Sequence, residues 1–411
     1  MSDPQLPVPV PAATSLPARA PVALVTATAS AEPGATPTRA LETATAIAAG
    51  GLALAHLGLV AASGVTRLVA STHATIVRTP LPWKHDHAAP AEQAPLPYSL
   101  VARSLQWLAG MAQRWSQALP APANDSLFHS ALNGVVGHTL AELDSPLAQG
   151  MSLRDEAGNP LSVADWAQSG RRGLVLFLHG LCLSEREWHT HEHQGFVREL
   201  REFGHGVAWL RYNTGHAIAD NGAALSDLLE SLPRHELPLT LVGHSMGGLV
   251  IRSAGYHAEI KGAHWVKQLR HAAYLGSPHH GAPLERLGDA ANRLLGLTPY
   301  TKGLMSLGNI RSRGIRDLRE GRVVPEHKAN PYRLVNSARH LLVAGHMGRN
   351  GQRHFMGDGM VPVRSALGQH VEAHRALHAK DVTRVEFDAL GHMQLLKDER
   401  VYATLLDWLK P

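Results

Sequence analysis

Continuous apolar runs alternate with amphipathic runs from about residue 170 onward. Six of the apolar runs have the length and composition of buried strands: 173–180, 205–213, 238–245, 270–278, 338–346 and 381–392. Between them, residues 217–232 and 248–258 carry apolar residues at helical spacing. Strands without a polar face, separated by helices, are typical of a parallel sheet that is covered on both sides. The pattern therefore predicts an α/β fold with a mostly parallel central sheet flanked by helices.

The chain is expected to divide into three parts. Residues 1–42 are rich in Pro, Ala and Thr and have no helical or strand period, which predicts a disordered tail. Residues 43–148 contain helix-like runs and predict a helical N-terminal extension. The α/β domain follows over 149–411, with an insertion at about 284–335 between two of its predicted strands.

Three runs in the extension have helical character. Residues 99–119 and 124–143 show helical spacing, and Asn124 or Asp125 is placed to cap the second run. The earlier run around 45–62 is apolar mainly through Ala and Gly, and polar residues interrupt it. This favours an amphipathic or core-packed helix over a membrane-spanning one. Whether residues 45–62 touch a membrane is left open.

Composition narrows the class of protein. The 411 residues are 44% hydrophobic and 18% charged, which suits a globular chain with a large core. The net charge of +5 comes from bases interspersed with acids, so no nucleic-acid partner is expected. Cys182 is the only cysteine, so no intrachain disulfide can form. This agrees with a reducing compartment, and the expected location is cytoplasmic with membrane association as an option.

The segment "LVGHSMGGLV", residues 241–250, carries the strongest chemical signal. It contains G-x-S-x-G, the strand-to-helix turn that presents a nucleophilic serine, here Ser245. The glycines two residues before and after the serine are needed because a Cβ at either place would clash in so sharp a turn. A Gly-rich turn without chemistry is the alternative, and the rest of the chain has to decide between them.

A serine hydroxyl needs a base, a carboxylate that orients the base, and donors for the oxyanion. His392 in "DALGHMQLL" follows the last predicted strand and is the candidate base. Asp358 in "FMGDGMVPVRSA" is the candidate acid, with Asp388 as its rival. Asp388 lies only four residues before His392 and is expected to be still on the strand. The order Ser, Asp, His is the one that such folds use.

The oxyanion donors are expected from two backbone N–H groups. Met246 follows the nucleophile, and Leu181 follows the His-Gly pair that closes the run 173–180. His179, Gly180 and His244 flank these donors and are expected to contact the substrate. An ordinary turn after a strand is the alternative for the His-Gly pair.

The motifs "LFLHGL", "LVGHSMGGLV", "LGSPHHGAPLER", "GDGMVPVRSA" and "GHMQLL" together resemble the lipase and esterase branch of the α/β-hydrolases. Within it, the chain is similar to bacterial proteins of the GPI inositol deacylase-like and triacylglycerol lipase group. The resemblance covers about residues 150–411 and implies an α/β-hydrolase fold. It also implies Ser245 as nucleophile, Asp358 as acid, His392 as base, and Leu181 and Met246 as the oxyanion hole. An insertion at 284–335 caps the site as a lid in such folds.

Other features have ordinary interpretations beside the functional ones. The histidines of "WHTHEHQ", 188–194, could bind a metal, but a solvated loop is expected and no metal is assigned. His279 and His280 are likewise expected in a solvated loop, and Cys182 as a small core residue. The basic stretch 309–322 is expected to be a solvated helix face, with an anionic head group or membrane surface as the alternative. Apolar residues of the lid could line an acyl pocket or pack the lid on the core: Leu294, Leu295, Leu297, Tyr300, Leu304, Met305 and Leu307.

The sequence therefore predicts a serine ester hydrolase that acts without a cofactor through an acyl-serine intermediate. Its substrate is expected to be a small-molecule or lipid ester, with peripheral membrane contact left open. An acyltransferase with the same three residues is one alternative. A non-catalytic, membrane-associated scaffold with this fold is the other. Acyl length, alcohol portion and oligomeric state are not defined by the sequence.

Overall fold

The computed structural model describes residues 96–118, 127–233, 237–283, 312–325, 332–348 and 357–410, with a few residues between 55 and 62. The predicted tail at 1–42, most of the run at 45–62 and most of the insertion at 284–335 lie outside the described residues. The seven apolar residues expected in the lid, from Leu294 to Leu307, lie outside them as well.

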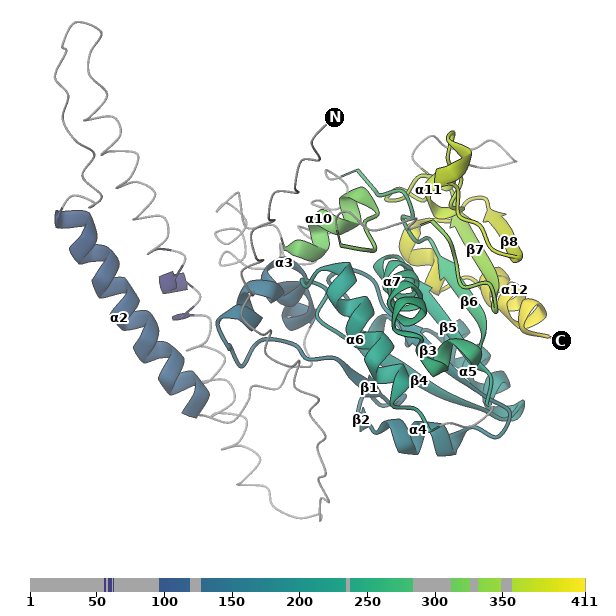
Figure 1. The fold of residues 1–411 in the computed structure, drawn as a ribbon, viewed down its shortest axis with the longest axis horizontal. Helices are drawn as coiled ribbons and strands as arrows, with labels where there is room; N and C mark the ends of the chain where they lie inside the picture. Colours follow the sequence, from purple (N-terminus) through teal and green to yellow (C-terminus); the bar gives the residue numbers. More distant parts are fainter. Residues whose placement is uncertain are drawn as a thin grey trace, which may run out of the picture.

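The described residues form an eight-stranded sheet in the order β2-β1-β4-β3-β5-β6-β7-β8 (Figure 1). The strands are β1 Ser152–Arg154, β2 Pro160–Leu161, β3 Gly173–Leu178, β4 His205–Arg211, β5 Leu239–His244, β6 Leu269–Leu275, β7 Arg339–Gly345 and β8 Asp381–Phe387. β1 pairs antiparallel with β2 and with β4, and all other neighbours are parallel. The predicted mostly parallel sheet is thus confirmed, and the turn at Gly158 joins β1 and β2 as a hairpin.

Helices cover both faces of the sheet (Figure 1). They are α4 Val163–Ser169, α5 His191–Glu202, α6 Ile218–Glu230, α7 Met246–Lys261, α10 Arg313–Glu320, α11 Val363–Ala366 and α12 Glu399–Leu409. Short 3₁₀ turns lie at η1 Glu185–Trp188, η2 His264–Lys267, η3 Ala373–Arg375 and η4 His392–Leu396. The two predicted helical runs of the extension are α2 Leu96–Ala118 and α3 Leu127–Glu142.

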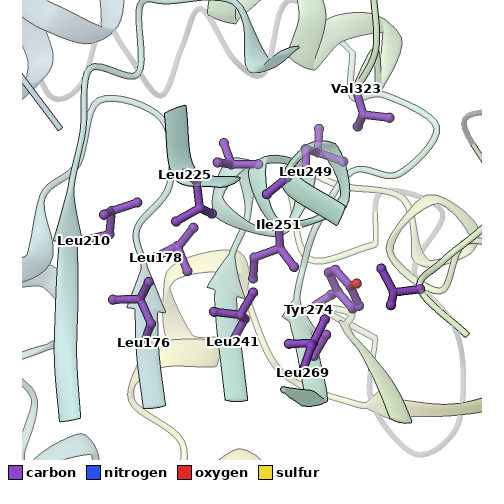
Figure 2. Close-up of a cluster of buried hydrophobic side chains, with 14 of the residues drawn as sticks. Leu176, Leu178, Leu210, Leu225, Leu241, Leu249, Ile251, Leu269, Tyr274 and Val323 are labelled. Carbon is purple, nitrogen blue, oxygen red and sulfur yellow. The ribbon is translucent and has the colours of Figure 1, made fainter. Parts of the chain in front are cut away.

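Alternate residues of β3 show how the core is divided between the two faces. Leu176 and Leu178 pack with α6 and α7 in one apolar cluster, which Figure 2 shows. Phe177, between them, packs with α5 and α12 in a second cluster. Side chains alternate across a strand, so a strand without polar residues feeds both clusters. All three are fully buried, and each such side chain stabilises the fold by about 2 kcal/mol.

No helix in the described part of the chain combines the length and apolarity that crossing a bilayer requires.

The run 188–194 is not the solvated loop that the sequence predicts. Thr190 caps α5 by accepting a hydrogen bond from the N–H of His193 at 3.1 Å. His193 then points into the core, where its Nε2 accepts a hydrogen bond from Trp209 Nε1 at 3.2 Å. The prediction was wrong because helical spacing turns every third or fourth residue inward, and His193 lies on the inner face.

Helix α10 belongs to the basic stretch 309–322, and its charges are arranged as a solvated face. Arg313, Arg316 and Arg319 are exposed. Asp317 faces the other way, and its carboxylate accepts a hydrogen bond from the N–H of Ile218 at 2.9 Å. Ala217, which precedes α6, has no side chain that could cap the helix, so Asp317 caps α6 from another part of the chain.

Replacing Asp317 by Asn is expected to raise the free energy of unfolding at neutral pH. Burial raises the pKa of Asp317 to about 6 from 3.8. The charged carboxylate therefore destabilises the folded chain at neutral pH. Asparagine keeps the acceptor for Ile218 and removes the charge, which predicts a gain of ~2 kcal/mol. A raised pKa adds stability below the unfolded pKa and loses it as pH rises through the folded one, so the gain shrinks towards pH ~4.

Urea unfolding curves at neutral and mildly acidic pH measure this gain. Asp317→Ala is the matched control, because it removes the charge and the cap together and is expected to forfeit about 1 kcal/mol of the gain. An Asp317→Asn protein that is less stable than the parent at neutral pH contradicts the prediction.

Candidate functional site

Ser245 occupies a strained turn between β5 and α7. Its backbone has φ 54° and ψ −120°, a region that side-chain-bearing residues rarely adopt. A Cβ added to Gly243 would lie 2.5 Å from Gly248 N, and one added to Gly247 would lie 2.5 Å from Leu178 O. The two glycines of the motif are therefore required by close backbone contacts, as the sequence predicts. The N–H of Ser245 donates to Leu275 O at 2.9 Å, which ties the turn to β6.

Asp358 and His392 form a buried pair at the same edge of the sheet. His392 Nδ1 lies 2.7 Å from Asp358 Oδ2, and both side chains are almost fully buried. The other carboxylate oxygen accepts hydrogen bonds from the N–H groups of Met360 at 2.9 Å and Val361 at 2.7 Å. The carboxylate is therefore fixed by its own loop and accepts from the imidazole in one orientation.

The rival acid is placed elsewhere. Asp388 lies at the end of β8, and its half-exposed carboxylate is 3.6 Å from the guanidinium of Arg400. The structure thus pairs His392 with Asp358, since the loop after β7 brings that residue back to the sheet edge.

His392 is held next to the turn that carries Ser245. His244, the residue before Ser245, has its Nε2 3.1 Å from the carbonyl oxygen of His392, and the two rings are 4.8 Å apart. Gly276, directly after β6, has φ 60°, and a Cβ there would lie 3.2 Å from both Asp358 Oδ2 and His392 Nδ1. The loops after β5, β6, β7 and β8 therefore meet at one place.

The Gly180–Leu181 peptide lies beside Ser245. A Cβ on Gly180 would be 3.1 Å from Ser245 Cβ. The Gly180 carbonyl oxygen lies 2.9 Å from His179 Nδ1 and accepts from the N–H of Leu183 at 3.3 Å. In a trans peptide the N–H points opposite to the C=O, so the Leu181 N–H points away from these two groups.

Leu181 and Met246 both carry N–H groups without an acceptor among the described residues. Met246 N is the first donor of α7, where the helix dipole favours negative charge. Two such donors flanking a serine are the arrangement that stabilises an oxyanion.

The neighbouring imidazoles are neutral at neutral pH. Burial lowers the pKa of His179 to about 4, and burial followed by the charge of His392 lowers the pKa of His244 well below its usual range. His179 stacks on Tyr212 with ring centroids 4.4 Å apart, and both histidine rings are buried. Their expected contact with substrate, and that of Gly180, stays a prediction.

Two further expectations about polar residues can be compared with the structure. His279 is fully buried beside Arg252, 3.3 Å from its guanidinium, so the predicted solvated loop is wrong for this residue. Cys182 is buried as predicted, and burial raises its thiol pKa to about 12. Among the described residues, no three His, Cys, Asp or Glu side chains are grouped as metal ligands would be.

Sequence reasoning missed two residues at this edge. Gly276 packs against the Asp358–His392 pair, and Thr214 accepts a hydrogen bond from Cys182 N at 3.1 Å. Gly276 directly follows β6 and Thr214 lies three residues after the end of β4, positions from which residues of a parallel sheet reach the same edge. Their position just beyond the end of a strand was the sequence signal that could have identified both residues.

Residues 218–349 match the family model described as PGAP1-like alpha/beta domain. The matched segment runs from α6 through β7 and includes Ser245, but it ends before Asp358 and His392. No curated protein matches the sequence significantly.

Three solved structures are similar to this chain at low sequence identity. The mature form of Bacillus licheniformis lipase BlEst2 has 17% identity and a TM-score of 0.41, over 64% of this chain and 98% of that one. Mouse alpha/beta hydrolase domain-containing protein 10 has 13% identity and a TM-score of 0.37, over 58% of this chain and 89% of that one. A soluble variant of Saccharomyces cerevisiae monoglyceride lipase has 13% identity and a TM-score of 0.38, over 63% and 89%.

The chain's own sheet order therefore defines its fold. Its parallel strands cross over in the order β4-β3-β5, and the strained serine turn sits at the end of β5, inside the segment that matches the family model. The chain has an α/β-hydrolase fold, and its residues 218–349 are similar to the PGAP1-like alpha/beta domain.

Proposed function

We propose that this protein is a serine ester hydrolase. The observation that carries the proposal is the buried 2.7 Å contact between His392 Nδ1 and Asp358 Oδ2, at the sheet edge where Ser245 is presented. A carboxylate on Nδ1 leaves Nε2 of the imidazole as the atom that can take a proton from a hydroxyl.

In the proposed reaction, His392 Nε2 accepts the proton of Ser245 Oγ as that oxygen attacks the ester carbonyl carbon. Asp358 holds the imidazole in the required tautomer and stabilises the imidazolium that forms. The carbonyl oxygen becomes an oxyanion and accepts hydrogen bonds from the N–H groups of Leu181 and Met246. Each such donor lowers the barrier by roughly 3 kcal/mol in comparable sites.

The imidazolium then gives its proton to the alcohol oxygen as the ester C–O bond breaks, which leaves an acyl-serine. Water attacks the acyl carbon while His392 Nε2 takes a proton from it. As the second oxyanion collapses, the bond between the acyl carbon and Ser245 Oγ breaks, and His392 gives that proton to Oγ, which releases the acid and regenerates Ser245. Every proton is moved by this one imidazole, so the residues named are sufficient for hydrolysis.

Apolar residues near Ser245 favour an ester with an apolar acyl portion. Leu181 packs against two apolar clusters, and Met246 is fully buried. A Cβ on Gly314 of α10 would lie 3.0 Å from Met246 Cε, so α10 closes one side of this region. These contacts support lipid-like esters as the substrate class.

A fluorophosphonate probe is expected to label the protein at Ser245 with one probe per chain, because the probe reacts with activated serines. Mass spectrometry of peptides from the labelled protein identifies the residue. Ser365, another buried serine, is the internal control and should remain unmodified. A chain that stays unlabelled, or is labelled elsewhere, contradicts the proposal and favours the scaffold alternative.

A panel of p-nitrophenyl esters of increasing acyl length, with and without detergent micelles, then defines the substrate class. Rates that rise with chain length and with micelles support a lipid-like substrate. A preference for the shortest ester would restrict the proposal to small esters.

A further inference from the structure

The loop that follows β3 contains a residue with a side chain in a strained backbone conformation. Cys182 has φ 61°, although it carries a side chain, and such a conformation costs of order 1–3 kcal/mol. Leu181 directly precedes it, so a rotation about the N–Cα bond of Cys182 moves the Leu181–Cys182 peptide and, through Leu181, displaces the neighbouring peptide that carries the Leu181 N–H. The loop therefore keeps its shape only if its surroundings hold Cys182 in place.

Thr214 supplies the polar part of this support. Its Oγ1 accepts a hydrogen bond from the N–H of Cys182 at 3.1 Å, and its side chain is 1% exposed. The segment that carries Thr214 is itself fixed. Asn213 Oδ1 accepts from Gly215 N at 2.9 Å, and Asn213 Nδ2 donates to Gly137 O of α3 at 3.1 Å.

Helix α3 supplies the steric part. A Cβ added to Gly134 would lie 2.3 Å from Cys182 Sγ and 2.9 Å from its Cα, so the helix touches the loop backbone at this glycine. Cys182 and Leu181 belong to the apolar cluster that α3 forms. The helix and Thr214 hold the same residue from two sides.

We propose that Thr214 is a positioning residue that, together with α3, sets the direction of the Leu181 N–H toward the oxyanion formed at Ser245. Thr214 acts through Cys182 and does not touch the substrate. This inference rests on the proposed function. It means that the rate of ester hydrolysis also depends on residues 127–142, which are far from Ser245 in the sequence.

Thr214→Val tests the hydrogen bond, since valine keeps the branched shape and removes the acceptor. We expect kcat for a p-nitrophenyl ester to fall about 10- to 100-fold with KM changed less than about threefold, because a misplaced donor affects the transition state. Thr214→Ser keeps the acceptor and is expected to stay within about threefold of the parent kcat. Thr240→Val, at a buried threonine inside β5, is the matched control and is expected to leave kcat within about twofold.

Gly134→Ala tests the helix without touching Thr214. Alanine is a better helix former than glycine, so its effect on α3 itself is favourable by about 1 kcal/mol. The clash with Cys182 is expected to lower kcat at least about tenfold with KM changed less than about threefold. Gly110→Ala in α2, where a Cβ meets nothing within 4 Å, is the matched control and should leave kcat unchanged.

The outcomes separate this inference from the proposed function. If the parent protein is neither labelled nor active, the proposed function fails and this inference fails with it. If the parent is active and Thr214→Val has the parent's kcat, only the inference is overturned, and a rise in KM alone overturns it too. If Thr214→Val shows no cooperative thermal unfolding, Gly134→Ala is compared with Gly110→Ala. Equal kcat values for these two variants overturn the inference, and a lower kcat for Gly134→Ala alone supports it.

Discussion

Ser245→Ala is expected to abolish ester hydrolysis, with kcat reduced by a factor of roughly 10⁴ or more. Alanine removes the only atom that can attack the carbonyl and changes nothing else in the turn. Alanine keeps the same Cβ at φ 54°, so the backbone strain and the fold are expected to persist. The measurement is single-turnover and steady-state hydrolysis of a short p-nitrophenyl ester.

Two further variants accompany this experiment: one at the candidate acid and one at a buried serine that serves as the control. Asp358→Asn should reduce kcat by about 10⁴, because an amide in place of the carboxylate no longer holds the imidazole tautomer. Ser365→Ala, at a serine that donates to Gly281 O at 2.8 Å, should leave kcat within about tenfold of the parent. Retained turnover in purified Ser245→Ala protein would remove this serine from the mechanism.

Mild acid is expected to unfold the protein. Four fully buried histidines have pKa values lowered chiefly by burial: His179 to about 4, His193 to about 3, and His244 and His279 well below 6.5. A lowered folded pKa means that the unfolded chain binds more protons, so the stabilisation is present above pH 6.5 and lost as pH falls. At pH 5 His179 and His193 each cost about 2 kcal/mol, a large fraction of the stability of a typical domain, and His244 and His279 act in the same direction.

Urea unfolding at a series of pH values from neutral to about pH 5 measures this loss. His193→Gln is the informative variant. Glutamine can still accept from Trp209, and the slope of the unfolding free energy against pH is expected to fall by about one proton. Asp317 acts in the opposite direction, since its pKa is raised. A protein whose stability is the same at neutral pH and at about pH 5 would contradict the prediction.

Much of the fold could be predicted because its signals are local. Runs such as 173–180 are apolar on both faces, and only a strand covered by helices on both sides buries them. The turn at Ser245 was readable because close backbone contacts require its glycines. The candidate base and acid followed from chain order, and the structure places His392 against Asp358.

The remainder depends on contacts between distant residues. His193 lies in a polar run, and its burial is determined by Phe177 and Trp209, which pack around it from two strands. Thr214 and Cys182 are separated by a helix and a strand, so no local pattern links them. The contact of α3 with the loop after β3 depends on a glycine, Gly134, which in the sequence alone marks only a weak point in a helix.

Backbone strain is concentrated at the catalytic edge proposed above. Among the described residues with side chains, positive φ occurs at Asp144, Cys182, Ser245 and Ala389, and the last three belong to the loops that carry Leu181, Ser245 and His392. Glycine at these positions would release about 1 kcal/mol each. Thermostabilisation by glycine substitution would therefore act first on the loops that need their fixed geometry. In this protein the same residues affect both thermal stability and turnover. Directed evolution for one of these properties is therefore expected to select against the other.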